Sequence, residues 1–166
     1  MFDKFGEFDS VEELNRAATG FKNEGDIESL IALAEENGID KEDAEDYADE
    51  VVEELANVTM AAFGRLKVLQ REEIDTKKNF VEKMPLQVIM TMLQGMCTQE
   101  DMAEAVMGKG KRVSKIYEAM KQEAEKHKEG KMGVSCGTDR ELCEIVKAYF
   151  TESDTAFRNR IVALYK

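Results

Sequence analysis

Apolar residues recur every three or four positions along most of this chain, which is the spacing of one face of an α-helix. The first such run predicts a helix over residues 11–23, because Ser10 and Glu13 have the spacing of a capping box and Gly25 can end a helix in a left-handed conformation. No segment of convincing length alternates apolar and polar residues with the period of two that a half-buried strand shows. The pattern therefore predicts an all-α protein.

Two further helices are predicted in the N-terminal part. One begins after Asp26 and ends at Gly38. The next begins after Asp40, and its apolar stripe continues at helical spacing past Leu66, with Gly64 as a weak point within it. We therefore expect one long third helix that starts near residue 41 and carries charged residues on its outer side.

The apolar rhythm lapses between residues 70 and 79, where charged residues accumulate. We place the main subdivision there, with an acidic helical region over 1–74 and a second helical region over 75–166. Pro85 is expected in the first turn of the next helix, because a proline deeper in a helix costs about 3 kcal/mol or more.

Cap signals mark the remaining helices. Thr98 is expected to cap a helix that ends at Gly108, and another helix is expected to open near Ser114. Thr138 with Glu141 forms a second capping box, and the stretch TAFRNRIVALYK forms a last short helix. The whole pattern predicts a compact multi-helix bundle of about seven or eight helices.

Composition places the chain among globular proteins. Its 166 residues are 43% hydrophobic and 35% charged, enough apolar material to form a core. The first ten residues include acidic ones, and no run of eighteen apolar residues occurs, so we expect neither a secretory signal nor a membrane span and predict a cytoplasmic protein. Three cysteines without a C-x-x-C pair argue against a disulfide framework and against a zinc site.

Charge is distributed unevenly around the net value of −12. Residues 1–60 hold nineteen Asp and Glu against four Lys and Arg, a net charge of −15, whereas residues 61–166 hold sixteen against nineteen, a net charge of +3. Such asymmetry indicates that one part addresses a charged partner. Direct nucleic-acid binding by the acidic half is not expected, because phosphates would be repelled.

The carboxylates concentrate on the outer side of the expected third helix, where five acidic pairs fall four residues apart. In a helix each such pair costs about 0.2–0.5 kcal/mol, or about 1–2.5 kcal/mol together. Two interpretations are open: a solvated face, or a row of charges that imitates a phosphate ladder and binds a protein cleft built for nucleic acid. The candidate partner-binding residues are Glu42, Glu45, Asp46, Asp49, Glu50, Glu53 and Glu54.

Other chemistry-bearing residues favour structural roles. His127, the only histidine, falls in the last turn of its helix, and Cys136 lies nine residues away without a third group to orient a nucleophile. The GKGK stretch at residues 108–111 lacks the strand and the G-K-[ST] ending of a P-loop, so the lysine-rich segment over 108–131 is interpreted as a solvated helix. We expect no catalytic residue, no metal site and no cofactor.

Two groups of apolar residues are expected to pack inside. Met fills irregular gaps in cores, so the methionines between residues 84 and 107 are interpreted as core residues. The three phenylalanines before the first helix, Phe2, Phe5 and Phe8, are expected to fold back as a hydrophobic lid.

Two portions of the chain resemble a known family. The stretch CTQEDMAEAVMGKGKRVSKIYEAMKQEAEKHKEG, followed by DRELCEIVKAYFTE, is similar to PcfK-like proteins, small helical proteins of conjugative elements and phages. The opening FDSVEELNRAATGFKNEGDIESLIALAEENGIDKEDAEDY looks like the segment that precedes them in some mobile-element relatives. The matching features are the acidic cap before MAEAVM and the residues Lys109, Lys111, Ser114, Ile116, Tyr117, Asp139, Glu141, Leu142, Val146, Tyr149 and Phe150.

Members of this family have been grouped with anti-CRISPR proteins, so the resemblance implies a stoichiometric inhibitor of the type II CRISPR RNA-guided DNA endonuclease. Combined with the charge pattern, it gives the hypothesis that residues 42–54 occupy a basic channel that normally holds DNA. The alternative is a PcfK-like accessory or adaptor protein of a conjugation system, with no nuclease target. The sequence does not predict the oligomeric state.

Overall fold

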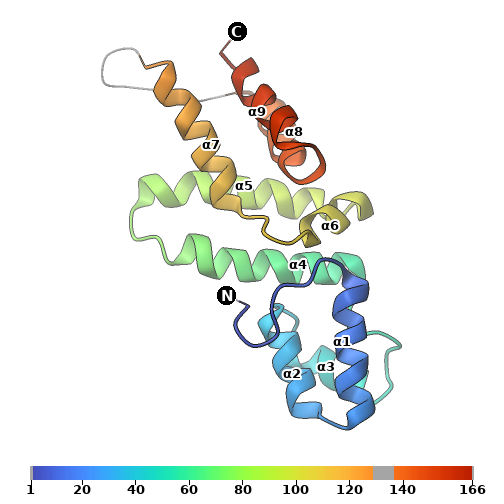
Figure 1. The fold of residues 1–166 in the computed structure, drawn as a ribbon. Coiled ribbons are helices and arrows are strands. Elements are labelled where there is room, and N and C mark those ends of the chain that lie inside the picture. The colour runs from blue at the N-terminus through green and yellow to red at the C-terminus, as the bar shows by residue number, and fades with distance from the viewer. Residues whose placement is uncertain (1, 129–136, 166) are drawn as a thin grey trace.

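The computed structural model describes residues 2–128 and 137–165, and within these ranges every regular element is a helix (Figure 1). The elements are α1 (Val11–Glu24), α2 (Ile27–Glu36), α3 (Lys41–Ala48), α4 (Val58–Leu69), the π-helical segment η1 (Gln70–Asp75), α5 (Phe80–Met96), α6 (Glu100–Met107), α7 (Val113–Lys126), α8 (Asp139–Thr151) and α9 (Asp154–Ala163). The all-α class is confirmed, with slightly more helices than expected.

Several helix ends lie where the cap residues predict them. The Ser10 side chain accepts a hydrogen bond from the Glu13 amide at 3.2 Å at the start of α1, and Gly25 ends that helix with a φ of 73°. At α8 the capping box is complete, because Thr138 and Glu141 bond each other's backbone amides. These local signals fix the helix ends without help from tertiary contacts.

Two other expected helix starts are wrong. The Thr98 hydroxyl donates to the Gly95 carbonyl oxygen at 2.9 Å instead of capping α6. α5 begins at Phe80, so Pro85 lies in its second turn rather than its first. The proline leaves the carbonyl of Val81 without its helical partner, and the site tolerates this because Val81 is 69% exposed, at the open end of the helix.

The helices form two hydrophobic cores that meet on α4. The first core joins α1, α2 and α3 and includes Ala61 of α4. The second joins α4 to η1 and α5 through α9 and includes Leu66 and Leu69 of the same helix. Figure 1 shows α4 between the α1–α3 unit and the C-terminal helices. The change from one core to the other thus lies within α4, whereas the sequence placed its subdivision after residue 74.

The turn after α2 approaches α4 very closely. Gly38 has a φ of 74°, and a β-carbon on it would overlap the backbone of Gly64. A β-carbon on Gly64 would in turn overlap the carbonyl oxygen of Asn37. Glycine at both positions therefore allows backbone-to-backbone contact, which sets where α3 begins relative to α4.

A buried ion cluster connects the N-terminal segment to α4 and to Arg112, the residue just before α7. Arg65 of α4 is 2% exposed, contacts the Glu7 carboxylate and donates to the Phe8 carbonyl oxygen at 2.6 Å. Arg112 donates to the two oxygens of Glu7, each at 3.1 Å. Burial raises the pKa of Glu7, but the hydrogen bond from Arg112 and the charges of both arginines outweigh it, so the net pKa lies below the ordinary value. No local pattern in the sequence marks this cluster.

The N-terminal phenylalanines form the expected lid. Phe8 is buried in the first core, the Phe5 ring packs edge-on against Phe21 at 5.4 Å, and the Arg65 guanidinium lies 4.8 Å from the centre of the Phe2 ring. The methionine expectation holds in part. Met90, Met102 and Met107 are buried, whereas Met84 is 49% exposed.

None of the helices within 2–128 and 137–165 has both the length and the apolar character needed to cross a membrane.

Candidate partner-binding face

Helix α3 ends at Ala48, so the single long helix expected from residue 41 past Leu66 is wrong. The Lys22 ammonium donates to the Tyr47 carbonyl oxygen at 2.7 Å, in the last turn of α3. Glu50 then takes a left-handed conformation with a φ of 63°, and the Val51 amide donates back to the Asp46 carbonyl oxygen at 2.9 Å. The chain stays non-helical until α4 begins at Val58.

The break has a physical cause that the periodicity conceals. Val51 and Val52 fit the helical stripe in sequence but are 68% and 42% exposed, whereas Leu55 and Ala56 are buried in the first core. Breaking the helix removes the like-charge contacts that helical spacing would create at Asp46/Glu50, Asp49/Glu53 and Glu50/Glu54. Non-Gly residues rarely adopt the left-handed conformation of Glu50, so burial of the following residues and relief of repulsion outweigh local preference.

One side chain holds the non-helical segment in place. The Asn15 amide of α1 donates to the Ala56 carbonyl oxygen at 2.8 Å, and its side-chain oxygen accepts from the Ala56 amide at 3.2 Å. Tyr47, at the other end of the segment, is buried, and its hydroxyl lies 2.9 Å from that of Thr19. The segment is therefore fixed against α1 at both ends.

The seven predicted residues divide between two elements. Those on α3 are Glu42, Glu45 and Asp46, and those in the following segment are Asp49, Glu50, Glu53 and Glu54. All except Glu45 are exposed. We call these seven residues the acidic face; they come from a helix and a loop instead of one helical ridge.

Intrachain cations compensate only part of this face. Glu45 pairs with Lys41 at 2.9 Å, Glu50 lies 4.0 Å from Lys22, and Glu54 accepts from the Asn15 amide at 3.5 Å. The other four carboxylates make no ion pair with a lysine or arginine of residues 2–128 and 137–165. These four unpaired members are Glu42, Asp46, Asp49 and Glu53.

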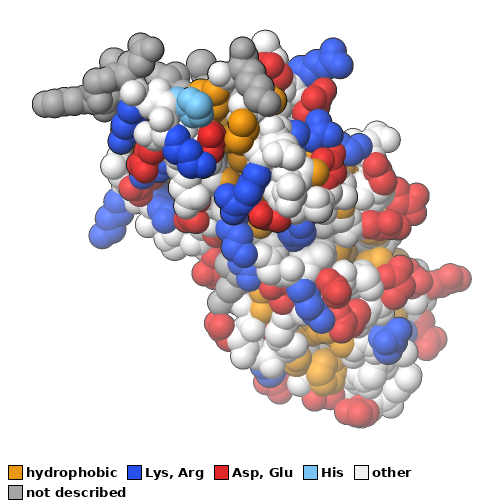
Figure 2. All heavy atoms as spheres, turned by 45° about the horizontal axis from the view of Figure 1, so that its top comes forward, with side chains coloured by type: hydrophobic (Ala, Val, Ile, Leu, Met, Phe, Trp, Pro, Cys, Tyr) orange, Lys and Arg blue, Asp and Glu red, His pale blue; other side chains and the backbone are white. Residues whose placement is uncertain are grey.

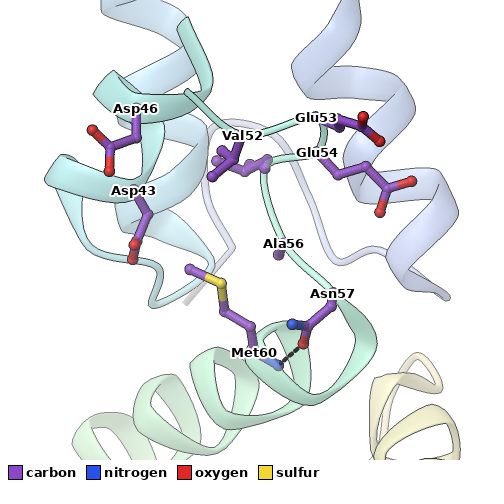
Figure 3. A pocket seen from close by; sticks show the side chains of 9 residues that line it. Asp43, Asp46, Val52, Glu53, Glu54, Ala56, Asn57 and Met60 are labelled. Carbon is purple, nitrogen blue, oxygen red and sulfur yellow. Dashed lines mark hydrogen bonds between the residues drawn. The ribbon is translucent and has the colours of Figure 1, made fainter. Parts of the chain in front are cut away.

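A hollow of about 340 Å³ lies between α3, the non-helical segment and the start of α4. Figure 3 shows Val52, Ala56 and Met60 around it, with the carboxylates of Asp46 on one side and of Glu53 and Glu54 on the other, all directed away from the hollow. Asp43 and Asn57 also line the hollow, so its lining mixes apolar and polar side chains, and several of the polar ones are acidic. No group of metal-binding side chains occurs in the part of the chain that the structure describes.

Basic residues gather elsewhere. Figure 2 shows lysine and arginine side chains mostly over the upper part of the molecule, formed by the C-terminal helices, and few of them over the α1–α3 unit. The charge asymmetry of the sequence thus becomes a separation in space. A cationic partner would be repelled least at the α1–α3 unit, where few lysines and arginines lie.

The residues that carry the family resemblance hold the fold together. The Lys111 ammonium donates to the Tyr149 carbonyl oxygen at 2.7 Å, and the Ser114 amide donates to Glu73 of η1 at 2.7 Å. Ile116 and Val146 lie in the second core. These contacts connect η1, α7 and α8, so this motif has a structural explanation that does not depend on a ligand.

His127 also makes structural contacts. Its ring stacks on Tyr165 with centroids 4.3 Å apart, and its Nε2 atom lies 3.2 Å from the Glu123 carboxylate. Cys136 lies outside the described residues, so the structure does not place the Cys136–His127 pair considered as a nucleophile.

No protein-family model, no curated protein and no solved structure matches this chain.

Proposed function

We propose that this protein is an anti-CRISPR inhibitor that binds a type II RNA-guided DNA endonuclease stoichiometrically in the bacterial cytoplasm, with the acidic face against a DNA-binding channel. The observation that carries this proposal is the group of four exposed carboxylates that make no ion pair within the part of the chain that the structure describes. The nuclease target is what the family resemblance implies, and the binding surface is inferred from the charge of the acidic face. The protein acts by occupancy and needs no cofactor.

Complementarity of charge supports binding to such a channel. Effector nucleases hold their guide–target duplex in a positively charged channel. Two unit charges 4 Å apart attract by about 1 kcal/mol in water and about 4 kcal/mol at the effective dielectric constant of a protein surface. Four carboxylates brought into such a channel would therefore compete with phosphates for the same lysines and arginines.

The acidic face is also ready to bind. Because Glu42, Asp46, Asp49 and Glu53 make no ion pair with residues 2–128 and 137–165, no such pair must break when a partner approaches. The Asn15–Ala56 hydrogen bonds and the Lys22–Tyr47 bond hold the segment before binding. Preorganisation of this kind lowers the entropic cost of association.

A DNA-cleavage assay with purified effector and rising inhibitor concentration tests the proposal at two salt concentrations. The Debye length falls from about 10 Å at 0.1 M to about 3 Å at 1 M, so inhibition should weaken steeply as salt rises. Changing Asp46 and Asp49 to Asn and Glu50 and Glu53 to Gln should raise the concentration needed for half inhibition by about 10-fold or more.

A matched variant controls for total charge. Glu24, Glu28, Glu72 and Glu104 are exposed carboxylates outside the acidic face, and their change to Gln alters the net charge by the same amount. This control should inhibit like the wild-type protein. Full inhibition by the acidic-face variant would refute the channel mechanism. Capture of conjugation proteins in place of the nuclease would favour the PcfK-like accessory function.

A further inference from the structure

The exposed face of α5 carries a row of large apolar side chains. Phe80, Val81, Met84 and Val88 are 70%, 69%, 49% and 43% exposed, and their spacing places them along one side of the helix. The 17 residues of α5 include only two charged ones, Glu82 and Lys83. In a chain that is 35% charged, this depletion is typical of the centre of a protein–protein interface.

A groove adjoins this row, and Met84 and Val88 of the row form part of its wall. Its volume is about 300 Å³, and its walls come from α5, α7 and α8. Val88 and Met92 line it on α5, Tyr117 and Met120 on α7, and Lys121 is the one charged residue that lines it. Methionine and tyrosine at such a surface adapt to an inserted apolar side chain.

We propose that this face is the interface of a homodimer, with the row of one copy seated in the groove of the other. A protruding row and a hollow on the same face are self-complementary, which is what a twofold interface requires. If two α5 helices pair antiparallel about Met84, Phe80 of each copy meets Val88 of the other, because the two residues are about 12 Å apart along the helix.

The distribution of charge fits a second copy as the occupant. Two chains of net charge −12 repel each other, but most of the negative charge lies in residues 1–60. α5 and α7 lie on the opposite side of α4 from the α1–α3 unit (Figure 1). This interface therefore joins two copies while keeping their acidic faces apart.

Sedimentation equilibrium from about 1 µM to about 1 mM protein tests the dimer. The average mass should rise from 18.8 kDa towards twice that value. Changing Val81 and Val88 to Lys should raise the dimer dissociation constant about 30-fold or more, because charges replace apolar anchors. The matched control changes Val51 and Val52 to Lys, two valines that are 68% and 42% exposed but lie in the non-helical segment, and it should dimerise like the wild type.

A second variant reports the geometry. Met84 lies near the proposed twofold axis, so a Met84→Cys variant should form an intermolecular disulfide under diamide, beyond the background of the wild-type cysteines. A mass that stays at that of one chain up to about 1 mM overturns the proposal. Dimers that the Val81/Val88 variant does not weaken overturn it equally.

Discussion

The close approach between the turn after α2 and α4 makes Gly64 the most sensitive test of the fold. Gly64 lies inside α4, where alanine would ordinarily be preferred by about 1 kcal/mol. Its added β-carbon would, however, overlap the carbonyl oxygen of Asn37. The obstacle is backbone, so no flexible side chain can move aside, and the turn that includes Gly38 must shift.

The two effects differ in size. Overpacking in a well-packed interior costs about 1–3 kcal/mol, occasionally more, and a clash against backbone belongs at the upper end. After the gain in helix propensity of about 1 kcal/mol is subtracted, Gly64→Ala should destabilise the protein by about 2 kcal/mol. Gly20 lies inside α1 and has open space where its β-carbon would be, so Gly20→Ala should stabilise by about 0.5–1 kcal/mol.

Urea unfolding followed by circular dichroism at 222 nm measures both changes. The free energies of unfolding of the two alanine variants should move in opposite directions while the m-value stays constant. A Gly64→Ala protein as stable as the Gly20→Ala protein would show that the turn after α2 does not press on α4, and the account of how α3 is positioned would fail with it.

Three further predictions concern single side chains. The folded-state pKa of Glu7 lies below its ordinary value of 4.5, so the ionised carboxylate stabilises the fold above that pH. This contribution is lost as the pH falls through the folded-state pKa. In urea titrations, Glu7→Gln should therefore be less stable than the wild type at pH 7 and should lose less stability on acidification. Asn15→Ala leaves the buried amide and carbonyl of Ala56 unpaired and should cost about 1–3 kcal/mol in the free energy of unfolding. Burial raises the pKa of the Cys97 thiol to about 11, so a thiol reagent at pH 8 should label Cys97 only when urea unfolds the chain.

Local signals in the sequence were sufficient for most helix ends. Ser10, Asp26 and Thr138 each accept a hydrogen bond from the backbone amide three residues later. A cap of this kind depends on residues within one turn, so its spacing can be recognised without knowledge of the fold. The start of α6 shows the limit, because Thr98 has the right spacing but its hydroxyl bonds to Gly95 in the turn before.

Long-range contacts decided the elements that the sequence did not predict. The cluster of Glu7, Arg65 and Arg112 joins residues up to 105 positions apart, and no local pattern marks such a pairing. The break after α3 is similar, since Val51 and Val52 continue the apolar stripe while Asn15 and Lys22 of α1 hold the chain in a non-helical path. Periodicity records which residues are apolar, but tertiary contacts decide which of them are buried.

The break after α3 changes how the acidic face is built, but the face still carries its seven carboxylates. A continuous helix would have held five carboxylate pairs at helical spacing, and repulsion within these pairs would have destabilised it. In the structure, Asp49, Glu50, Glu53 and Glu54 lie beyond the end of α3, so the four-residue spacing no longer places them one turn apart on a helix. Relief of repulsion contributes to the break, and most of the charge stays available to a partner: among the described residues, only Glu45 and Glu50 of the acidic face make an ion pair with a lysine or arginine. The affinity for a cationic surface should consequently depend on both elements together, because Asp46 on α3 and Glu53 in the non-helical segment lie on either side of one hollow.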